Sequence, residues 1–327
     1  MTYKYKNVYI DDSSIIGGKY ENEGPLKQYF DRTYSDFYFG EQTFEQAEIK
    51  IMKDSIDKVL EKTNKTINDI DVFIAGDLSN QIVNSNYVAR ELKIPYLGVY
   101  NACSTSAEAI IIGANMIEAK QANNILTSVS AHNLMAEKQF RFPSEYGGNK
   151  LKYTTFTVTC GASLILTNQK SKIKVESSTI GKVIDMGVTD VNNMGGVMAP
   201  GACDVILTHL KETNRDISYY DFVLTGDLGL YGKEILKELM KKNNVSLDKY
   251  NDAGVMLYDL KKQDVFAGGS GPSCGPAVLY GFIFDNMKKG KMKKVLYVPT
   301  GALMNTTMVN QKMTIPCISH AISLEVE

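Results

Sequence analysis

The 327-residue chain is 44% hydrophobic and 22% charged, which is ordinary globular composition. It carries 36 Lys and Arg against 37 Asp and Glu, so no basic excess indicates a nucleic-acid partner. No apolar run reaches the ~18 residues that a membrane span needs, and residues 1–12 lack the apolar core of a signal peptide. We therefore expect an intracellular protein whose membrane contacts, if any, are peripheral or made through a partner.

Short apolar stretches alternate with helical patterns along the whole chain. Strands are predicted at residues 7–10, 71–75, 95–100, 124–130, 163–166, 172–175, 221–224, 255–258 and 294–298. Helices are predicted at residues 45–63, 85–92, 105–120, 207–213, 233–243 and 276–289. This alternation predicts an α/β fold with buried, mostly parallel sheets covered by helices.

The chain also repeats itself. Residues 63–78 read TNKTINDIDVFIAGDL and residues 213–228 read TNRDISYYDFVLTGDL, with seven of sixteen positions identical. Two weaker echoes follow in the same order: SSIIG at 13–17 with SSTIG at 177–181, and 116–131 with 287–302 at an offset of 171. The repeats predict a duplicated domain with halves at 1–170 and 171–327. The first half would contain a cap segment at 132–156.

A cysteine lies where a strand meets a helix. Residues 94–106 read IPYLGVYNACSTS, which places Cys103 directly before a helix start. The free amides and partial positive charge there lower a thiol's pKa, and the amides of Ser104, Thr105 and Ser106 offer an anion site. The alternative is that a free cysteine is only a small buried hydrophobe, which we prefer for the cysteines at 160, 203 and 317. No CxxC pair or histidine cluster predicts a metal or cofactor site.

The strand–ACSTS–helix elbow, the GDL strand ends and the duplication resemble the thiolase and ketoacyl-synthase superfamily. The resemblance implies a five-layer αβαβα fold in which the elbow cysteine carries an acyl group, activated by His or Asn residues of the second half. Those partner positions fall on Gly226 and Gly269, and the second cysteine of the degradative enzymes falls near Pro299. None of these residues supplies a base or a proton donor, so we expect a vestigial Cys103 and no catalysis.

Longer stretches resemble one non-catalytic branch, the stage V sporulation protein AD family of spore-forming Firmicutes. The similar segments are residues 24–36, 75–106, 130–148, 265–276 and 300–321. The resemblance implies binding of dipicolinic acid, alone or with calcium, and its movement into the forespore. It also implies partners among the membrane subunits of the stage V sporulation A complex, and a peripheral location at the inner spore membrane. Homodimers are common in the superfamily, but the sequence leaves the oligomeric state open.

Dipicolinate is a flat ring with two carboxylates, and segment 132–148 contains side chains suited to both parts. The cationic donors would be His132, Lys138 and Arg141, and the ring faces would be Phe140, Phe142 and Tyr146. His132 follows the strand at 124–130, so we expect it near the elbow. The alternative is that this segment is a cap loop or a dimer interface, with Arg141 in a solvated ion pair.

Asp77 and Asp227 end the two repeated strands and would face the central cleft. Each could instead cap the loop after its strand, which we prefer for Asp77 and leave open for Asp227. The predicted ligand-binding residues are Cys103, Ser104, Thr105, His132, Arg141, Tyr146, Asp227 and Gly269. Three hypotheses remain: a dipicolinate-binding subunit, an acyltransferase or acyl-CoA condensing enzyme that uses Cys103 with His132 as base, and a structural scaffold.

Overall fold

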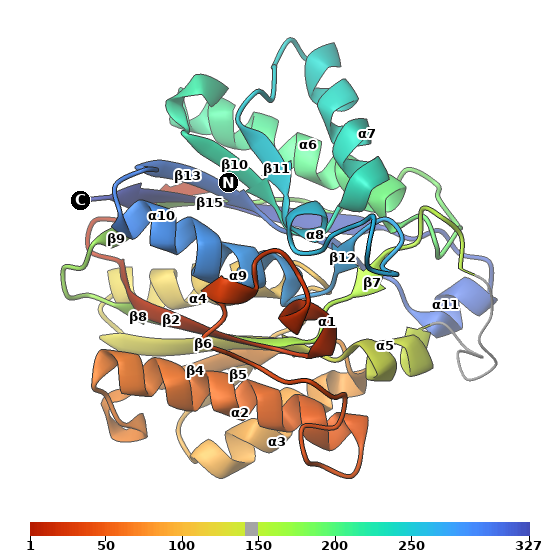
Figure 1. Cartoon of the computed structure of the whole chain (residues 1–327). Coiled ribbons are helices and arrows are strands. Elements are labelled where there is room, and N and C mark those ends of the chain that lie inside the picture. Colours follow the sequence, from red (N-terminus) through yellow and green to blue (C-terminus); the bar gives the residue numbers. More distant parts are fainter. Residues whose placement is uncertain (141–149) are drawn as a thin grey trace.

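The computed structural model describes residues 1–140 and 150–327. It has five layers, and Figure 1 shows them edge-on. Helices α2 (Phe44–Thr63) and α3 (Val83–Leu92) cover one sheet from outside, and α6 (Met194–Thr213) and α7 (Gly229–Lys242) cover the other. Helix α4 (Thr105–Glu118) lies between the sheets. The predicted five-layer αβαβα fold is confirmed.

The two sheets have the same topology. The first runs in the order β5 (Tyr96–Gly98), β4 (Val72–Gly76), β6 (Asn124–Ala131), β8 (Cys160–Thr167) and β2 (Tyr9–Gly17). The second runs in the order β11 (Tyr250–Asp252), β10 (Phe222–Thr225), β13 (Lys294–Val298), β15 (Cys317–Val326) and β9 (Ile173–Ile180). In each sheet the first three strands are parallel and the last two are antiparallel to their neighbours. Strands β2 and β9 also pair at one corner, which joins the sheets.

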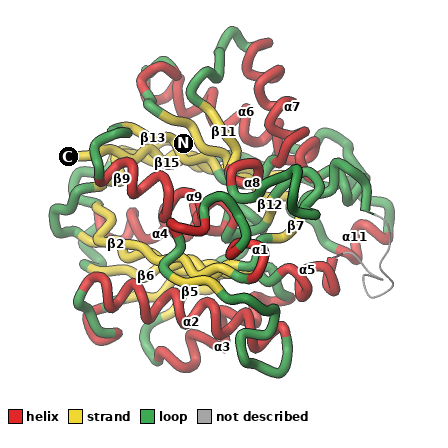
Figure 2. The backbone as a smooth tube through the Cα atoms, in the orientation of Figure 1, coloured by secondary structure: helices red, strands yellow, loops and turns green. Residues whose placement is uncertain are grey.

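The middle layer contains α4 and a second helix made of α9 (Cys274–Val278), a π-helical turn (Leu279–Ile283) and α10 (Phe284–Lys288). Figure 2 shows these helices enclosed between strands. The remaining helices are α1 (Lys19–Asn22), α5 (Asn133–Phe140), α8 (Ala253–Met256) and α11 (Thr306–Asn310). The remaining strands are β1 (Thr2–Lys4), β3 (Arg32–Thr33), β7 (Phe156–Thr157), β12 (Gly269–Ser270) and β14 (Thr300–Ala302).

The duplication extends to single hydrogen bonds. Asn64 and Asn214 end α2 and α6 in the left-handed conformation, with φ of 51° and 54°. One carboxylate oxygen of Asp71 accepts from the amides of residues 123 and 124 at 2.7 and 3.0 Å, and Asp221 accepts from those of 293 and 294 at 2.8 and 3.0 Å. These bonds align the third echo at an offset of 170, so the predicted offset of 171 is wrong by one residue.

Two predicted elements differ from the structure. Residues 255–258 form no strand, because helix α8 occupies Ala253–Met256 and the edge strand β11 lies just before it. Helix α6 begins at Met194 rather than at residue 207, and it contains Pro200. The first of these errors reflects the ambiguity of a four-residue apolar run, which fits a strand or a buried helical turn equally well.

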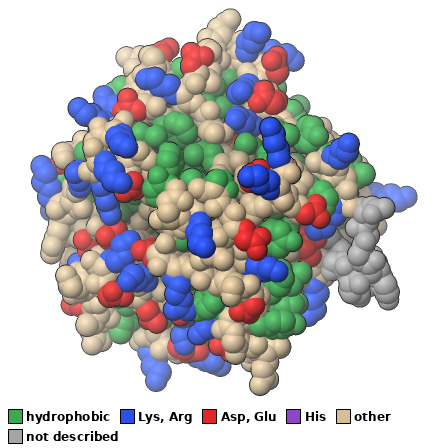
Figure 3. Space-filling view, in the orientation of Figure 1, with side chains coloured by type: hydrophobic (Ala, Val, Ile, Leu, Met, Phe, Trp, Pro, Cys, Tyr) green, Lys and Arg blue, Asp and Glu red, His purple; other side chains and the backbone are tan. Residues whose placement is uncertain are grey.

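Charges are mixed over the face of the molecule in Figure 3, where basic and acidic side chains alternate. Among the described residues, no helix combines the length and the apolar composition that a bilayer crossing requires.

Candidate functional site

The elbow is a tight, strained turn before α4. Ala102 has φ of 48°, a left-handed conformation that costs an alanine about 1–2 kcal/mol. The amide of Ser104 donates to Asn101 O at 3.0 Å, and the amide of Thr105 donates to Ala102 O at 3.3 Å. Both side chains are fully buried. The prediction that Ser104 and Thr105 bind an anion through free amides is therefore wrong, because the turn itself uses these N–H groups.

Cys103 faces a buried carboxylate. Its Sγ lies 4.0 Å from Ser270 Oγ, which donates a hydrogen bond to Asp227 Oδ2 at 2.9 Å. Burial raises the pKa of the Cys103 thiol well above its usual value, and the charge of Asp227 raises it further. The sequence predicted a lowered pKa from the helix start, so this expectation is wrong: desolvation and a neighbouring carboxylate outweigh the helix dipole.

Asp227 is held by donors from three directions. Its Oδ2 accepts from Ser270 Oγ at 2.9 Å and from the amide of Gly271 at 3.2 Å, and its Oδ1 accepts from Thr300 Oγ1 at 2.8 Å. Asp227 is 1% exposed, and burial raises the pKa of its carboxyl despite these bonds. The alternative left open by the sequence is thereby decided: Asp227 faces the elbow rather than capping its own loop.

A second buried carboxyl lies next to Asp227. Asp252 Oδ2 accepts from Thr225 Oγ1 at 2.7 Å and from the amide of Leu228 at 2.8 Å, and its Oδ1 accepts from the amide of Gly229 at 2.9 Å. Burial raises the pKa of Asp252 to about 7, and the charge of Asp227 contributes. The two aspartates form one electrostatically coupled pair behind the cysteine.

A cavity of about 60 Å³ opens beside Cys103. Most of its walls are apolar, and the polar groups come from small side chains, one tyrosine and one glutamate. Its lining residues are Leu78, Tyr100, Ala102, Cys103, Ala136, Glu137, Phe140, Thr157, Val191, Met194, Ser270, Ala302 and Met304. Glu137 pairs with Lys150 at 3.0 Å. The cavity is smaller than the roughly 300 Å³ at which ligand pockets begin.

The structure places His132 away from this cavity. Its Nε2 lies 2.8 Å from Phe37 O, and its ring stacks on Phe44 at 5.1 Å between centroids. The side chain is fully buried, and burial lowers its pKa. The expectation that His132 projects toward the elbow is wrong, because the side chain points to the aromatic residues that precede and open α2.

The other predicted residues have separate outcomes. Arg141 and Tyr146 lie outside the described residues. Gly269 does not line the cavity, because a Cβ there would meet Val158, Cys274 and Tyr258 at 3.0 to 3.2 Å. The other residue of β12, Ser270, lines the cavity instead. Asp77 caps the loop after β4 by accepting from both the amides and the hydroxyls of residues 79 and 85, as preferred from the sequence.

His320 is a residue near the elbow that the sequence reasoning missed. It lies on β15, and its Nε2 is 2.6 Å from the side-chain amide of Asn101, two residues before Cys103. Its Nδ1 accepts from the amide of Gly181 at 3.2 Å, and burial lowers its pKa to about 4. The imidazole is therefore neutral, with both nitrogens engaged by groups other than the thiol. It lies in the family-similar segment 300–321, but no strand was predicted there, so its place beside the elbow was not foreseen.

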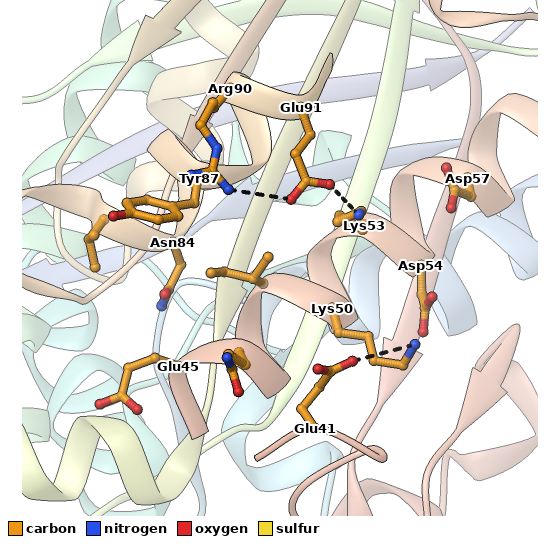
Figure 4. Close-up of a pocket in the computed structure, with 13 residues that line it drawn as sticks. Glu41, Glu45, Lys50, Lys53, Asp54, Asp57, Asn84, Tyr87, Arg90 and Glu91 are labelled. Atoms are coloured by element: carbon orange, nitrogen blue, oxygen red, sulfur yellow. Dashed lines mark hydrogen bonds and ion pairs between the residues drawn. The ribbon is translucent and has the colours of Figure 1, made fainter. Parts of the chain in front are cut away.

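A larger cavity of about 700 Å³ lies between α2 and α3 and shares no lining residue with the first. Figure 4 shows that acidic and basic side chains are mixed along it and that Lys53 of α2 pairs with Glu91 of α3. Glu91 also contacts Arg90, and Lys50 lies 4.0 Å from Glu41. Because both signs of charge line this groove, it offers no single-sign surface for an ionic ligand.

Comparison with known proteins decides the family. The family model "Stage V sporulation protein AD (SpoVAD)" matches residues 2–325. Stage V sporulation protein AD of Bacillus subtilis (strain 168) is 41% identical over 319 residues, which is 97% of this chain and 94% of that protein. This chain belongs to the stage V sporulation protein AD family. Membership assigns it a role in sporulation.

Solved structures show that this chain shares its fold with a 3-oxoacyl-[acyl-carrier-protein] synthase and with OleA. The 3-oxoacyl-[acyl-carrier-protein] synthase III of Aquifex aeolicus VF5 superposes with a TM-score of 0.59 at 14% identity, over 97% of this chain and 99% of that one. The cerulenin-bound OleA of Xanthomonas campestris gives 0.60 at 12% identity, over 98% of each chain. At these identities the likeness shows the fold alone.

A Cβ on Gly226 would lie 3.1 Å from Pro299 Cα, so these two positions pack directly on each other. Among the described residues, no group of three or more His, Cys, Asp or Glu side chains is placed to hold a metal ion.

Proposed function

We propose that this SpoVAD chain binds dipicolinate in the cavity at Cys103, without catalysing acyl transfer, and serves its uptake into the forespore. The observation that carries the proposal is that the elbow cysteine lines a cavity while a buried carboxylate, Asp227, acts on its thiol and bonds the Ser270 hydroxyl beside it. A carboxylate keeps the thiol protonated, and a protonated thiol is a poor nucleophile. Family membership supports the role in sporulation.

The walls of the cavity suit a flat aromatic acid. Leu78, Phe140 and Met304 offer apolar faces for a ring, and Thr157 offers a hydroxyl donor for a carboxylate. At about 60 Å³ the cavity holds roughly two water molecules, so ring entry requires side chains to move. Methionine has three rotatable bonds, so we expect the side chains of Met304 and of Met194 in α6 to change rotamer when the ring enters.

Calorimetric titration with dipicolinate tests this function. We expect micromolar affinity, or about -8 kcal/mol. Met304→Trp fills the cavity and should abolish binding. Met308→Trp, on the exposed helix α11 where the native side chain is 52% exposed, is the matched control and should bind normally. Failure of the wild-type protein to bind at millimolar dipicolinate would contradict the proposal.

Acyl transfer is the second candidate, because Cys103 is retained at the elbow and is partly exposed. It requires a thioester on the sulfur, and hence removal of the thiol proton. Incubation with acyl-CoA followed by mass spectrometry of the intact protein decides between the candidates. We expect no mass increase in the wild-type chain. An acyl group that appears on the wild type and is lost in Cys103→Ala would establish the enzyme instead.

The partners that we propose are membrane subunits of the sporulation complex and a second copy of this chain. Strand β5 is an edge of the sheet, and Leu97 on it is 43% exposed, with Tyr100 just after it at 46% and Tyr87 of α3 at 46%. An unpaired edge strand with apolar side chains is suited to pairing with another chain. Sedimentation analysis should give a dimer for the wild type and a monomer for Leu97→Lys, and a monomeric wild type would contradict the pairing.

A further inference from the structure

The Cys103 cavity is surrounded by acidic groups. Asp227 and Asp252 lie behind the cysteine, each almost wholly buried. Glu137 stands in the cavity wall, where Lys150 pairs with it. The other titratable groups close enough to sense the charge of Asp227 are Cys103 of the elbow, Cys274 of α9 and Tyr297 of β13. Apart from Lys150, which is paired with Glu137, all of these groups are neutral or acidic.

This arrangement conflicts with binding of a free dianion. Dipicolinate carries two negative charges at neutral pH, and the cavity would bring them close to the Asp227–Asp252 pair. Like charges in a poorly solvated interior repel strongly, because little water is present to screen them. The hydrogen-bond donors of Asp227 are two hydroxyls and one amide, so among the described residues no cation bonded to it offsets the repulsion.

We propose that ligand binding in this cavity takes up one proton, which the Asp227–Asp252 pair accepts as the acid enters. The proposal rests on the function proposed above and adds to it the form of the ligand: a dicarboxylic acid that binds together with a proton rather than as the bare dianion. The pair is the proton acceptor because its two carboxyls are coupled to each other and Asp227 bonds the Ser270 hydroxyl that lines the cavity.

The hydrogen bonds around the pair allow this protonation. Thr225, Ser270 and Thr300 contact the two carboxyls through hydroxyl groups, and a hydroxyl can rotate from donor to acceptor. A protonated carboxyl would thus keep a partner for its new O–H. The pKa of Asp252 of about 7 means that the free protein holds this proton only in part at neutral pH. A bound anion nearby raises the pKa of Asp252 further, so this carboxyl becomes fully protonated when the ligand binds.

The linkage has a definite sign. Binding raises the pair's pKa, so the ligand's affinity is greatest below the free value of about 7 and falls as pH rises through it. For one proton taken up, the dissociation constant should increase about tenfold per pH unit above pH ~8 and should be nearly constant below pH ~6.

Calorimetry of the wild-type protein with dipicolinate and a metal chelator, at about pH 8 in phosphate and in Tris, counts protons directly, because the buffers differ in ionisation enthalpy. We expect uptake close to one proton per ligand. Asp252→Asn and Asp227→Asn should each reduce uptake toward zero and flatten the pH dependence. Asp77→Asn, at the equivalent strand end of the first half, should leave the proton count unchanged.

The possible failures are distinguishable. Wild-type binding with no proton uptake, or binding that appears only when the chelator is replaced by a divalent cation, would overturn the proton proposal and leave dipicolinate binding intact. No binding under any of these conditions would overturn the proposed function itself. Circular dichroism should first show that Asp227→Asn and Asp252→Asn are folded. If proton uptake then persists in both variants, another group accepts the proton and the assignment to this pair is wrong.

Discussion

The two halves bury acidic groups at the same point of the fold but use them differently. In the first half Asp77 is bonded to its own loop and helix start, and Glu48 of α2 lies close enough to sense its charge. In the second half Asp227 binds groups from β12 and β14, and its charge acts on the cysteine of the other half. The two halves therefore share one scaffold, and the loops that follow the equivalent strands determine that the second half contributes its carboxylate to the site.

The largest expected difference between the halves is the loss of stability when two equivalent glycines are replaced by alanine. A Cβ on Gly76 would lie 2.0 Å from the backbone oxygen of Val99, whereas a Cβ on Gly226 would meet Pro299 at 3.1 Å. Gly76→Ala should lower the free energy of unfolding by about 3 kcal/mol or more, and Gly226→Ala by about 1 kcal/mol. Urea denaturation measures both, and equal losses would contradict the packing described for these two strand ends.

A second difference concerns the pH dependence of stability. Burial raises the pKa of Glu48 to about 8, with the charge of Asp77 contributing. The folded state thus holds a proton that the unfolded state releases near its ordinary pKa of 4.5. The stabilisation that this proton gives the folded state is fully present below pH ~4.5 and is lost as the pH rises to ~8.

Glu48→Gln tests this assignment, because an amide does not titrate. The variant should lose less stability than wild type between about pH 5 and pH 8, by on the order of a few kcal/mol. Chemical denaturation across that pH range measures the difference. Parallel curves for the two proteins would show that Glu48 does not hold the proton.

The smallest expected effect is at the cysteine itself. Because Cys103 is held as a neutral thiol, Cys103→Ser should leave the dipicolinate affinity within about threefold of wild type, a change of under 1 kcal/mol. Its alkylation by iodoacetamide at neutral pH should be slower than that of a free cysteine and should accelerate only at alkaline pH. Rapid alkylation at neutral pH would indicate an activated nucleophile and would favour the acyltransferase.

Much of the fold could be predicted from the sequence, since the repeated strands, the elbow and the duplication all leave local patterns. Strand β13 was predicted with its observed bounds. The site was less predictable, because its contacts join residues far apart in the chain: Cys103 meets Ser270, and Asn101 meets His320. The helix-dipole argument for a reactive thiol was local and was overridden by burial. His132 was misplaced because proximity to a strand end does not fix the direction of a side chain.

The central claim is that the Cys103 cavity binds dipicolinate, and a structure of the complex tests it most directly. The account predicts ligand density beside Cys103, between Phe140 and Met304, with Met304 displaced and no covalent bond to the sulfur. Density in the charged groove between α2 and α3, or an adduct on the sulfur, would contradict it.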